Sequence, residues 1–267
     1  MRSICRVILL NVFIGGILFA QTGGFFEIAS STSIHMIITD PIGRRTGGDP
    51  RGVHADTAYG ITWLREIPEA NYSFESIGSE SDSGDNDSID NMKFMYSPRI
   101  PDDCGMYTIQ AIGTKADSFW IDASIRRSFS QSDSSWGLQV TGLIDKDSVV
   151  TFRLAFLAPD TSRATLVKVV DMQSLFLDIA LSKKLGFCSN ETLMSKYASF
   201  LDEARSSLAH GELLHARNRL SLMSSSLARE SDANFKRIAR DVLQEDTRLL
   251  LVQLDKSLSV ARDRKAR

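Results

Sequence analysis

The amino-acid sequence predicts an α+β protein of two domains, an N-terminal antiparallel β-sandwich and a C-terminal antiparallel helical bundle. Short apolar segments separated by turn signals fill the first half of the chain, which is the pattern of a sandwich. After Pro159 the apolar residues recur at helical spacing instead. A charged N-terminus and a short apolar run precede both. We therefore expect a signal peptide at 1–20, a β-sandwich domain at 25–160 and a helical bundle domain at 165–262.

The first region has the organisation of a secretory signal peptide. Arg2 and Arg6 precede an apolar run from Val7 to Phe19, and the small Ala20 ends it. This run is shorter than the roughly 20 apolar residues of a membrane span. Leu18 is large for its place in a cleavage site, so an uncleaved membrane anchor stays open as the alternative. The signal predicts a secreted or periplasmic protein with no stable membrane span after cleavage.

Six segments of the first half have the pattern of strands. Side chains of a half-buried strand alternate between two faces, as Tyr107, Ile109 and Ala111 do on one face of their segment. Turn-forming residues such as Asp40-Pro41 separate the segments. The expected strands are 33–40, 92–96, 107–112, 118–125, 137–141 and 149–157.

Four amphipathic segments of the second half predict helices joined by short connections, which is typical of antiparallel neighbours in a bundle. Glycine is common just after a helix, and Asn, Ser and Asp are common N-caps. The first helix is therefore expected to end at Gly186 and the second to run from Asn190 to Gly211, while Ser231 or Asp232 caps the fourth. The apolar stripes comprise Leu175 and Ile179; Leu193, Tyr197, Leu201, Ala204 and Leu208; Leu213, Ala216, Leu220, Met223 and Leu227; and Phe235, Ile238, Val242, Leu249 and Leu254.

Charge and cysteine content narrow the possible partners. The net charge of −2 gives no basis for nucleic acid or an anionic membrane surface as the main partner. Cys5 leaves with the signal peptide, and Cys104 and Cys188 remain, one in each half. An oxidising compartment would permit a disulfide between them, but we favour two separate buried thiols.

A discontinuous motif in the first half resembles a β-sandwich module of exported bacterial proteins. It comprises the segment TDPIGRRTGGDP at 39–50, the segment EIPEANY at 66–72, and Gly105-Met106-Tyr107. In the module a TDPxGRRTGxDP sequence recurs early and GxY opens a later strand. The resemblance covers about half of the mature chain and implies an extracellular accessory domain with no assigned catalytic residues.

The second half resembles the small helical modules called FIMAH, and more loosely the FIVAR type, found at the C-termini of secreted bacterial proteins. Residues 209–220 carry a glycine followed by an alanine and a leucine at helical spacing, and 182–186 match the end of the first helix of such modules. Both resemblances imply an exported, non-catalytic protein, and neither implies a ligand.

Two groups of side chains are candidates for binding. Arg44 and Arg45 lie beside a glycine-rich turn, where guanidinium groups could bind carboxylate or phosphate. The alternative is a structural turn in which Asp40 accepts from turn amides and Arg44 braces a neighbouring loop. Among the aromatic residues, Trp136 is expected to be exposed and suited to a sugar or a protein partner, whereas Trp120 is expected in the core.

The acidic segment 79–91 is the candidate metal site. Calcium is bound by several oxygen ligands, and a glycine at position 84 would let the segment bend around it. The spacing departs from an EF-hand loop because Lys93 stands where its last glutamate would be, so a solvated loop is the alternative. The candidate calcium ligands are Asp82, Asp85, Asp87 and Asp90.

No pattern of nucleophile, base or metal ligands predicts catalysis, and no cofactor other than calcium is expected. The sequence therefore predicts an exported non-catalytic binding or structural protein of the cell envelope or extracellular space, with a protein or glycan partner. The alternative is an enzyme or a ligand-sensing protein with its site at the junction of the two domains.

Overall fold

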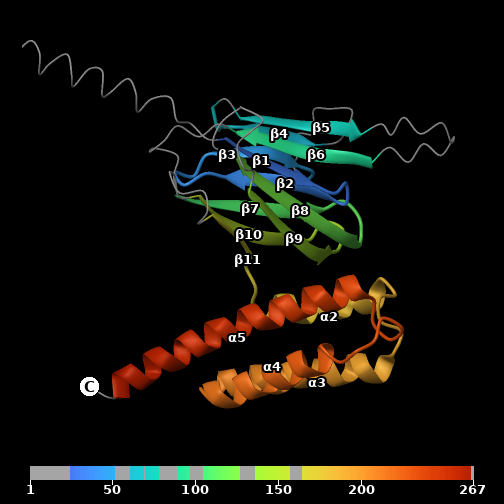
Figure 1. Ribbon diagram of the computed structural model, residues 1–267, viewed down its shortest axis with the longest axis vertical. Helices are drawn as coiled ribbons and strands as arrows, with labels where there is room; N and C mark the ends of the chain where they lie inside the picture. Colours follow the sequence, from blue (N-terminus) through green and yellow to red (C-terminus); the bar gives the residue numbers. More distant parts are fainter. Residues whose placement is uncertain are drawn as a thin grey trace, which may run out of the picture. The chain divides into compact units, whose positions relative to one another are not determined.

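The computed structural model describes residues 25–51, 61–68, 70–77, 89–96, 105–126, 136–156 and 164–265. The expected signal peptide lies outside the described residues. In the described part of the chain, no helix is long and apolar enough to cross a membrane. The structure confirms the α+β class: within the described ranges eleven strands precede four helices, which are named as in Figure 1.

The strands form two antiparallel sheets, consistent with a β-sandwich. One sheet has the order β5 (Asn71–Ile77), β6 (Ile89–Tyr96), β1 (Phe25–Ser30), β8 (Asp117–Arg126) and β9 (Trp136–Ile144). The other has the order β11 (Thr165–Lys168), β10 (Val149–Phe156), β7 (Gly105–Gly113), β2 (Ile34–Thr39), β3 (Arg45–Asp49) and β4 (Thr62–Arg65).

All six expected strands are present, and the alternation of β7 and β8 buries the residues that it predicts. Phe119, Ile121 and Ala123 of β8 are buried. The core position expected for Trp120 is wrong, because Trp120 points to the opposite face of β8 and is only half-buried. The expected acidic loop also ends earlier than predicted, since Asp90 lies within β6.

Strand β3 shows why one glycine-rich segment was misread as a turn. Gly43 does lie in a turn, with φ of +92°, but Gly47 lies in β3 opposite Ile37 of β2. A Cβ on Gly47 would stand 2.0 Å from the carbonyl oxygen of Met36, and its φ is +127°. Only glycine allows the two backbones to approach this closely. The sequence pattern did not distinguish this close pairing from a turn.

The helices are α2 (Met172–Lys184), α3 (Glu191–Ala209), α4 (Leu213–Leu227) and α5 (Arg237–Lys265). Their predicted boundaries are confirmed at Gly186, with φ of +66°, and at Gly211, with φ of +76°. The Asn190 side chain accepts from the backbone N–H of Leu193 at 3.0 Å, which is the expected N-cap of α3. Helix α3 packs against α4, α4 against α5, and α2 against α3 and α5.

The expected start of the fourth helix is wrong. Helix α5 begins at Arg237, not after Ser231 or Asp232. The carbonyl of Ser231 instead closes a turn by accepting from the N–H of Phe235 at 3.0 Å. Phe235 is fully buried and forms a β-bridge with Cys188. Pairing with a distant segment therefore decides the start of the helix.

Backbone contacts divide the chain into two compact units. The sandwich unit comprises 1–110, 121–140 and 152–167, and the helical unit comprises 111–120, 141–151 and 168–267. The expected sequence boundary at 160–164 assigned both hairpin segments, 111–120 and 141–151, to the sandwich. Leu143 from the second of these segments is fully buried and belongs to the hydrophobic core of the helices.

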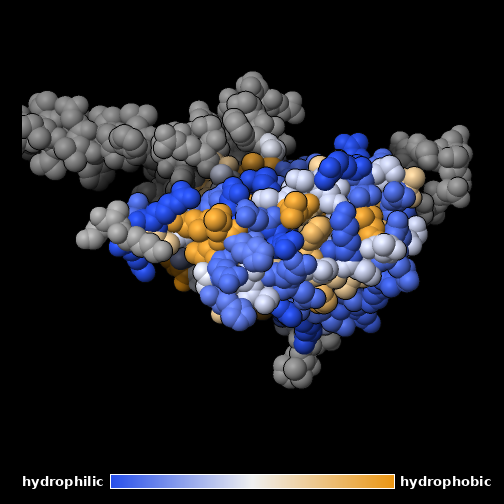
Figure 2. Space-filling model, turned by 90° about the horizontal axis from the view of Figure 1, so that it is seen from below, coloured by the Kyte–Doolittle hydropathy of each residue, from blue (hydrophilic) through white to orange (hydrophobic). Residues whose placement is uncertain are grey.

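The surface of the helices keeps several apolar side chains in contact with solvent. Leu214 and Leu222 of α4 and Val252 and Val260 of α5 are exposed. The face shown in Figure 2 carries hydrophobic patches that are separated by hydrophilic side chains. Scattered apolar residues of this kind are normal on a protein surface and do not by themselves mark a binding site.

Candidate functional site

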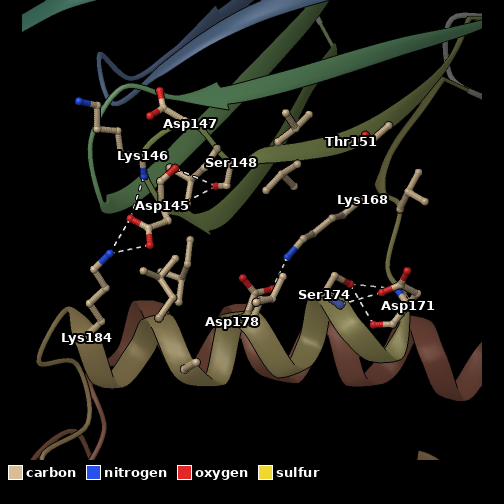
Figure 3. Close-up of a pocket in the computed structure, with 18 residues that line it drawn as sticks. Asp145, Lys146, Asp147, Ser148, Thr151, Lys168, Asp171, Ser174, Asp178 and Lys184 are labelled. Atoms are coloured by element: carbon tan, nitrogen blue, oxygen red, sulfur yellow. Dashed lines mark hydrogen bonds and ion pairs between the residues drawn. The ribbon is translucent and has the colours of Figure 1, made fainter. Parts of the chain in front are cut away.

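A pocket of about 680 Å³ lies within the helical unit, between the β9–β10 hairpin and α2 (Figure 3). Its lining residues all come from 143–151 and 168–184. The volume is in the range of sites that hold small molecules. The geometry of these two segments therefore defines the candidate site.

The hairpin side of the pocket is fixed by a tight turn. Ser148 donates its backbone N–H at 3.2 Å and its hydroxyl at 2.8 Å to the carbonyl of Asp145. Asp147 adopts a positive φ of 61° at the tip. Its N–H donates to the carbonyl of Gly113 at the end of β7, while the Gly113 N–H donates to the carbonyl of Ser148. These bonds hold the turn against a neighbouring strand.

The opposite wall is one face of α2. Asp171 caps this helix, because its carboxylate accepts from the N–H of Ser174 while the Ser174 hydroxyl accepts from the N–H of Asp171. Residues three or four apart on a helix share a face, so a single stripe of α2 points to the pocket. The residues of α2 that line the pocket are Ser174, Leu177, Asp178, Ala180, Leu181 and Lys184.

An ion pair joins the two walls at one end. The Lys184 ammonium donates to both carboxylate oxygens of Asp145, at 2.6 and 2.8 Å. This hydrogen bond lowers the pKa of Asp145 below its usual value. Both side chains are substantially exposed, at 57% and 40%, so solvent screens the pair. The pair links the hairpin to the last turn of α2.

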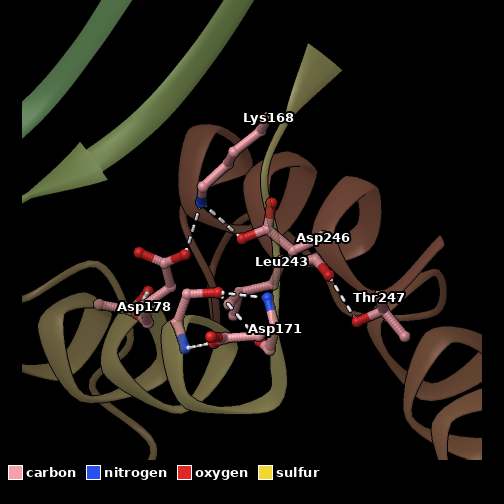
Figure 4. A network of polar contacts seen from close by, with 8 residues as sticks. Lys168, Asp171, Asp178, Leu243, Asp246 and Thr247 are labelled. Atoms are coloured by element: carbon pink, nitrogen blue, oxygen red, sulfur yellow. Dashed lines mark hydrogen bonds and ion pairs between the residues drawn. The ribbon is translucent and has the colours of Figure 1, made fainter. Parts of the chain in front are cut away.

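A buried charge cluster connects β11, α2 and α5 (Figure 4). Lys168, at the end of β11, places its Nζ 2.7 Å from Oδ2 of Asp178 on α2 and 2.7 Å from Oδ2 of Asp246 on α5. The three side chains are only 6%, 7% and 1% exposed. Of the three, Lys168 and Asp178 line the pocket. We call these three residues the Lys168 cluster.

Burial determines the charge of the Lys168 cluster. The pKa of Asp246 is raised to about 8: burial is the largest cause, Lys168 opposes it, and the hydrogen bond and charge of Asp178 add to the rise. Burial also disfavours the charged form of Lys168, but the two carboxylates outweigh it and its pKa is raised overall. Near neutral pH Asp246 is therefore mainly protonated beside the Lys168 ammonium.

Apolar side chains surround this cluster at the pocket opening. Val149, Val169 and Leu177 are 37%, 43% and 57% exposed, and all three line the pocket. Deeper in, Leu143 and Leu181 are buried. Such a combination of apolar walls and a few placed polar groups is typical of a binding site for a small molecule.

The chemistry of the cluster suits binding better than reaction. An amine nucleophile must lose its proton, which requires a lowered pKa, whereas the two carboxylates keep Lys168 protonated. Asp246 has a raised pKa but is 1% exposed and does not line the pocket, so a bound molecule does not reach it.

The paired arginines of the predicted binding motif are engaged inside the sandwich unit. Arg44 pairs through Nε with Asp40 at 2.5 Å, whose carboxylate also accepts from the N–H groups of Ile42 and Arg44. Arg45 pairs with Glu66 at 3.0 Å. Arg44 thus braces its own turn.

The same contacts bring the three separate parts of the motif together. The Arg45–Glu66 pair joins its first and second segments. A Cβ on Gly105 would stand 2.9 Å from the ring of Pro41, so the third segment packs closely on the first. The motif residues form an internally paired corner of the sandwich unit.

Other predicted residues lie outside the described part of the chain. The candidate calcium ligands Asp82, Asp85 and Asp87 lie outside it, and so do the side chains of Asp90 and Trp136. The described residues, which do not include 79–88 of the acidic segment, contain no group of three or more His, Cys, Asp or Glu side chains that could hold a metal ion. Cys188 is a buried free thiol whose pKa is raised by burial, while Cys104 lies outside the described residues.

Sequence reasoning missed the Lys168 cluster, although a signal was present. Asp178 lies three residues after Leu175 and Asp246 four residues after Val242, so both carboxylates fall on apolar helix stripes. A charged residue on the apolar face of a helix is buried together with that face. A buried charge is in turn paired with an opposite charge. That pattern predicts a cluster but does not identify its members.

Comparisons of the chain with protein-family models, with curated proteins and with solved structures find no match. The geometry of the pocket is therefore the basis for interpreting function.

Proposed function

We propose that this chain is an exported, non-catalytic binding protein of the cell envelope or extracellular space that holds a small ligand in the pocket between the β9–β10 hairpin and α2. The pocket itself carries the proposal: its volume of about 680 Å³, its apolar walls and its buried polar cluster match a small-molecule site. The export signal predicted at 1–20 gives the location.

The proposal includes the finer architecture. The two compact units are two domains, and the four helices form an antiparallel bundle, which the packing of α3 on α4 and of α4 on α5 supports. The resemblances to an exported β-sandwich module and to FIMAH-type helical modules fit this organisation. A protein or glycan partner of the sandwich remains a further prediction from sequence.

The test is to recover the ligand with the chain that begins at Gln21. The purified protein is incubated with an extract of its native cell envelope, and bound small molecules are identified by native mass spectrometry. Leu177→Arg places a bulky charge at the pocket opening and should abolish capture. Leu222→Arg is the matched control, because Leu222 is 49% exposed on α4 and does not line this pocket.

Capture by the wild-type protein and by Leu222→Arg, but not by Leu177→Arg, supports the proposal. Capture that Leu177→Arg leaves unchanged would contradict the assignment of the pocket. Conversion of the captured molecule into another compound would favour the enzyme alternative.

Export and calcium binding need separate tests. Sequencing the N-terminus of protein from its native host should give a start near Gln21, and an intact Met1 in the cytosol would contradict export.

If the acidic segment binds calcium, calcium at a hundred times its dissociation constant should stabilise the fold by about 2.7 kcal/mol. Asp85→Asn with Asp87→Asn should remove that shift, and a melting curve unaffected by calcium or EDTA leaves a solvated loop.

A further inference from the structure

We infer that the pocket takes a small neutral molecule with an apolar body and one polar head that both donates and accepts hydrogen bonds, such as a hydroxyl or a carboxamide. The inference rests on the proposed function, because it names the chemical class of ligand for the same pocket. It depends on the hydrogen-bonding capacity, the charge and the apolar surface of the described lining residues.

The Lys168 cluster offers one donor and one acceptor to a ligand. An ammonium has three N–H donors. Lys168 uses two of them, one for Asp178 and one for Asp246, and the third can donate to a ligand. Asp178 accepts from Lys168 through Oδ2 and is also hydrogen-bonded to Asp246, and the four or so lone-pair sites of a carboxylate leave Oδ1 able to accept from a ligand. That oxygen turns away from Lys168 toward the pocket (Figure 3). Because both side chains are more than nine-tenths buried, a ligand that satisfies them gains well-shielded hydrogen bonds.

The same two groups disfavour ions of either sign. A ligand anion at Lys168 would stand beside the Asp178 carboxylate, and a ligand cation at Asp178 would stand beside the Lys168 ammonium, only 2.7 Å away from it. Asp246 adds no net charge while it is protonated. An ionic head would therefore lose its hydration and meet a like charge, whereas a neutral head that donates to Asp178 and accepts from Lys168 avoids both costs.

The rest of the pocket selects an apolar body. Val149, Val169 and Leu177 are apolar side chains left in solvent around the opening, and a bound apolar group would cover them. Since these residues come from the hairpin, from the β11–α2 connection and from α2, a body that touches all three spans the opening. The polar head then lies at the Lys168 cluster.

Four probes that share one body and differ only in the head test this inference: 3-phenylpropan-1-ol, 3-phenylpropanamide, 3-phenylpropanoate and 3-phenylpropylammonium. Their dissociation constants for the chain from Gln21 are measured at neutral pH by ligand-observed NMR and calorimetry. The alcohol and the amide should bind at least tenfold more tightly than either ion.

Variants connect binding to the named residues. Leu177→Ser should weaken all neutral probes several-fold, while the control Leu222→Ser should leave their affinities unchanged. Asp178→Asn removes the carboxylate beside Lys168 and should shift the preference toward 3-phenylpropanoate by tenfold or more. Circular dichroism identifies a misfolded Asp178→Asn, and the Leu177→Ser comparison does not depend on that variant.

The outcomes separate this inference from the proposed function. Tighter binding of an ionic probe, lost in Leu177→Ser, would overturn the neutral-head class and keep the pocket as a ligand site. Binding that Leu177→Ser does not weaken, or no binding by any probe together with no molecule captured from the envelope extract, would overturn both. Preference for the neutral heads with loss in Leu177→Ser supports both.

Discussion

The Asp40 turn of the sandwich unit and the Lys168 cluster of the helical unit both hold charged side chains together, but they differ in exposure and in reach along the chain. Asp40 pairs with Arg44, four residues away, and although the Asp40 carboxylate is buried, Arg44 is 31% exposed. Lys168 pairs with Asp246, 78 residues away, and all members of its cluster are at most 7% exposed. The first contact stabilises a local turn, whereas the second joins β11, α2 and α5.

This difference has an energetic consequence. An exposed partner keeps much of its hydration when the other partner is removed, so the loss is modest. A buried charge has no water to replace its partner, and breaking the contact leaves an uncompensated charge in a low-dielectric environment. The two regions should therefore respond very differently to single substitutions.

The largest effect is expected for Lys168→Met. It leaves the carboxyl groups of Asp178 and Asp246 buried without their ammonium partner, and we expect a loss of about 3–5 kcal/mol in the free energy of unfolding. Urea denaturation followed by circular dichroism measures this. The control is Lys183→Met, whose ion pair with Glu191 is exposed, and it should unfold at nearly the wild-type urea concentration. Similar midpoints for the two variants would refute a structural role for the cluster.

The division between the regions is tested by Leu143→Ala. Leu143 is fully buried and belongs to the helical core, although it lies in strand β9. Truncation should cost about 2–5 kcal/mol. Leu143→Ala should lower the midpoint at which the helical signal at 222 nm is lost, and it should lower it more than Leu154→Ala does. Leu154 of β10 is fully buried in the sandwich unit instead. Equal shifts would mean that the units unfold as one.

Within the sandwich unit, two glycines with positive φ allow a matched comparison. Gly47→Ala places a methyl group against the carbonyl of Met36 and should cost about 3 kcal/mol. Gly43→Ala meets no atom within 4 Å and should cost only the backbone strain, about 1 kcal/mol. Thermal melts of both variants test this order, and an equal loss would show that the close approach of β2 and β3 is relaxed in solution.

The smallest change in the free energy of unfolding at acidic pH is expected for Asp246→Asn, whose effect appears in the pH dependence of stability. Folding raises the pKa of Asp246 from 3.8 to about 8, so folding favours its protonated form. The stability that this contributes is fully present below the unfolded pKa and is lost as the pH rises through the folded pKa. An amide cannot ionise beside Lys168 and Asp178, so Asp246→Asn should lose less stability than the wild type between about pH 5 and pH 8. If the free energies of unfolding of the wild type and Asp246→Asn change in parallel with pH, the raised pKa of Asp246 is contradicted.

Local patterns in the sequence determined much of the architecture. Alternation and short apolar runs between turn signals predicted six of the strands, and helical periodicity with Asn190, Gly186 and Gly211 predicted the ends of α2 and α3. These signals succeed because side-chain alternation, capping and positive φ depend on a few consecutive residues. The start of α5 was missed, because the pairing of Phe235 with Cys188 overrides the nearby capping residues.

What only the tertiary structure decided is where distant residues meet. Gly47 was read as part of a turn because nothing local reveals that Met36 lies against it. Asp178 and Asp246 were recognisable as charges on apolar stripes, yet their common partner Lys168 lies on a separate strand. Long-range contacts follow from how strands and helices pack. The local pattern of a single sequence does not show which distant residues that packing brings together. The sequence by itself thus determined the α+β class and many element boundaries, whereas the pocket and its buried charge cluster exist only in the folded chain.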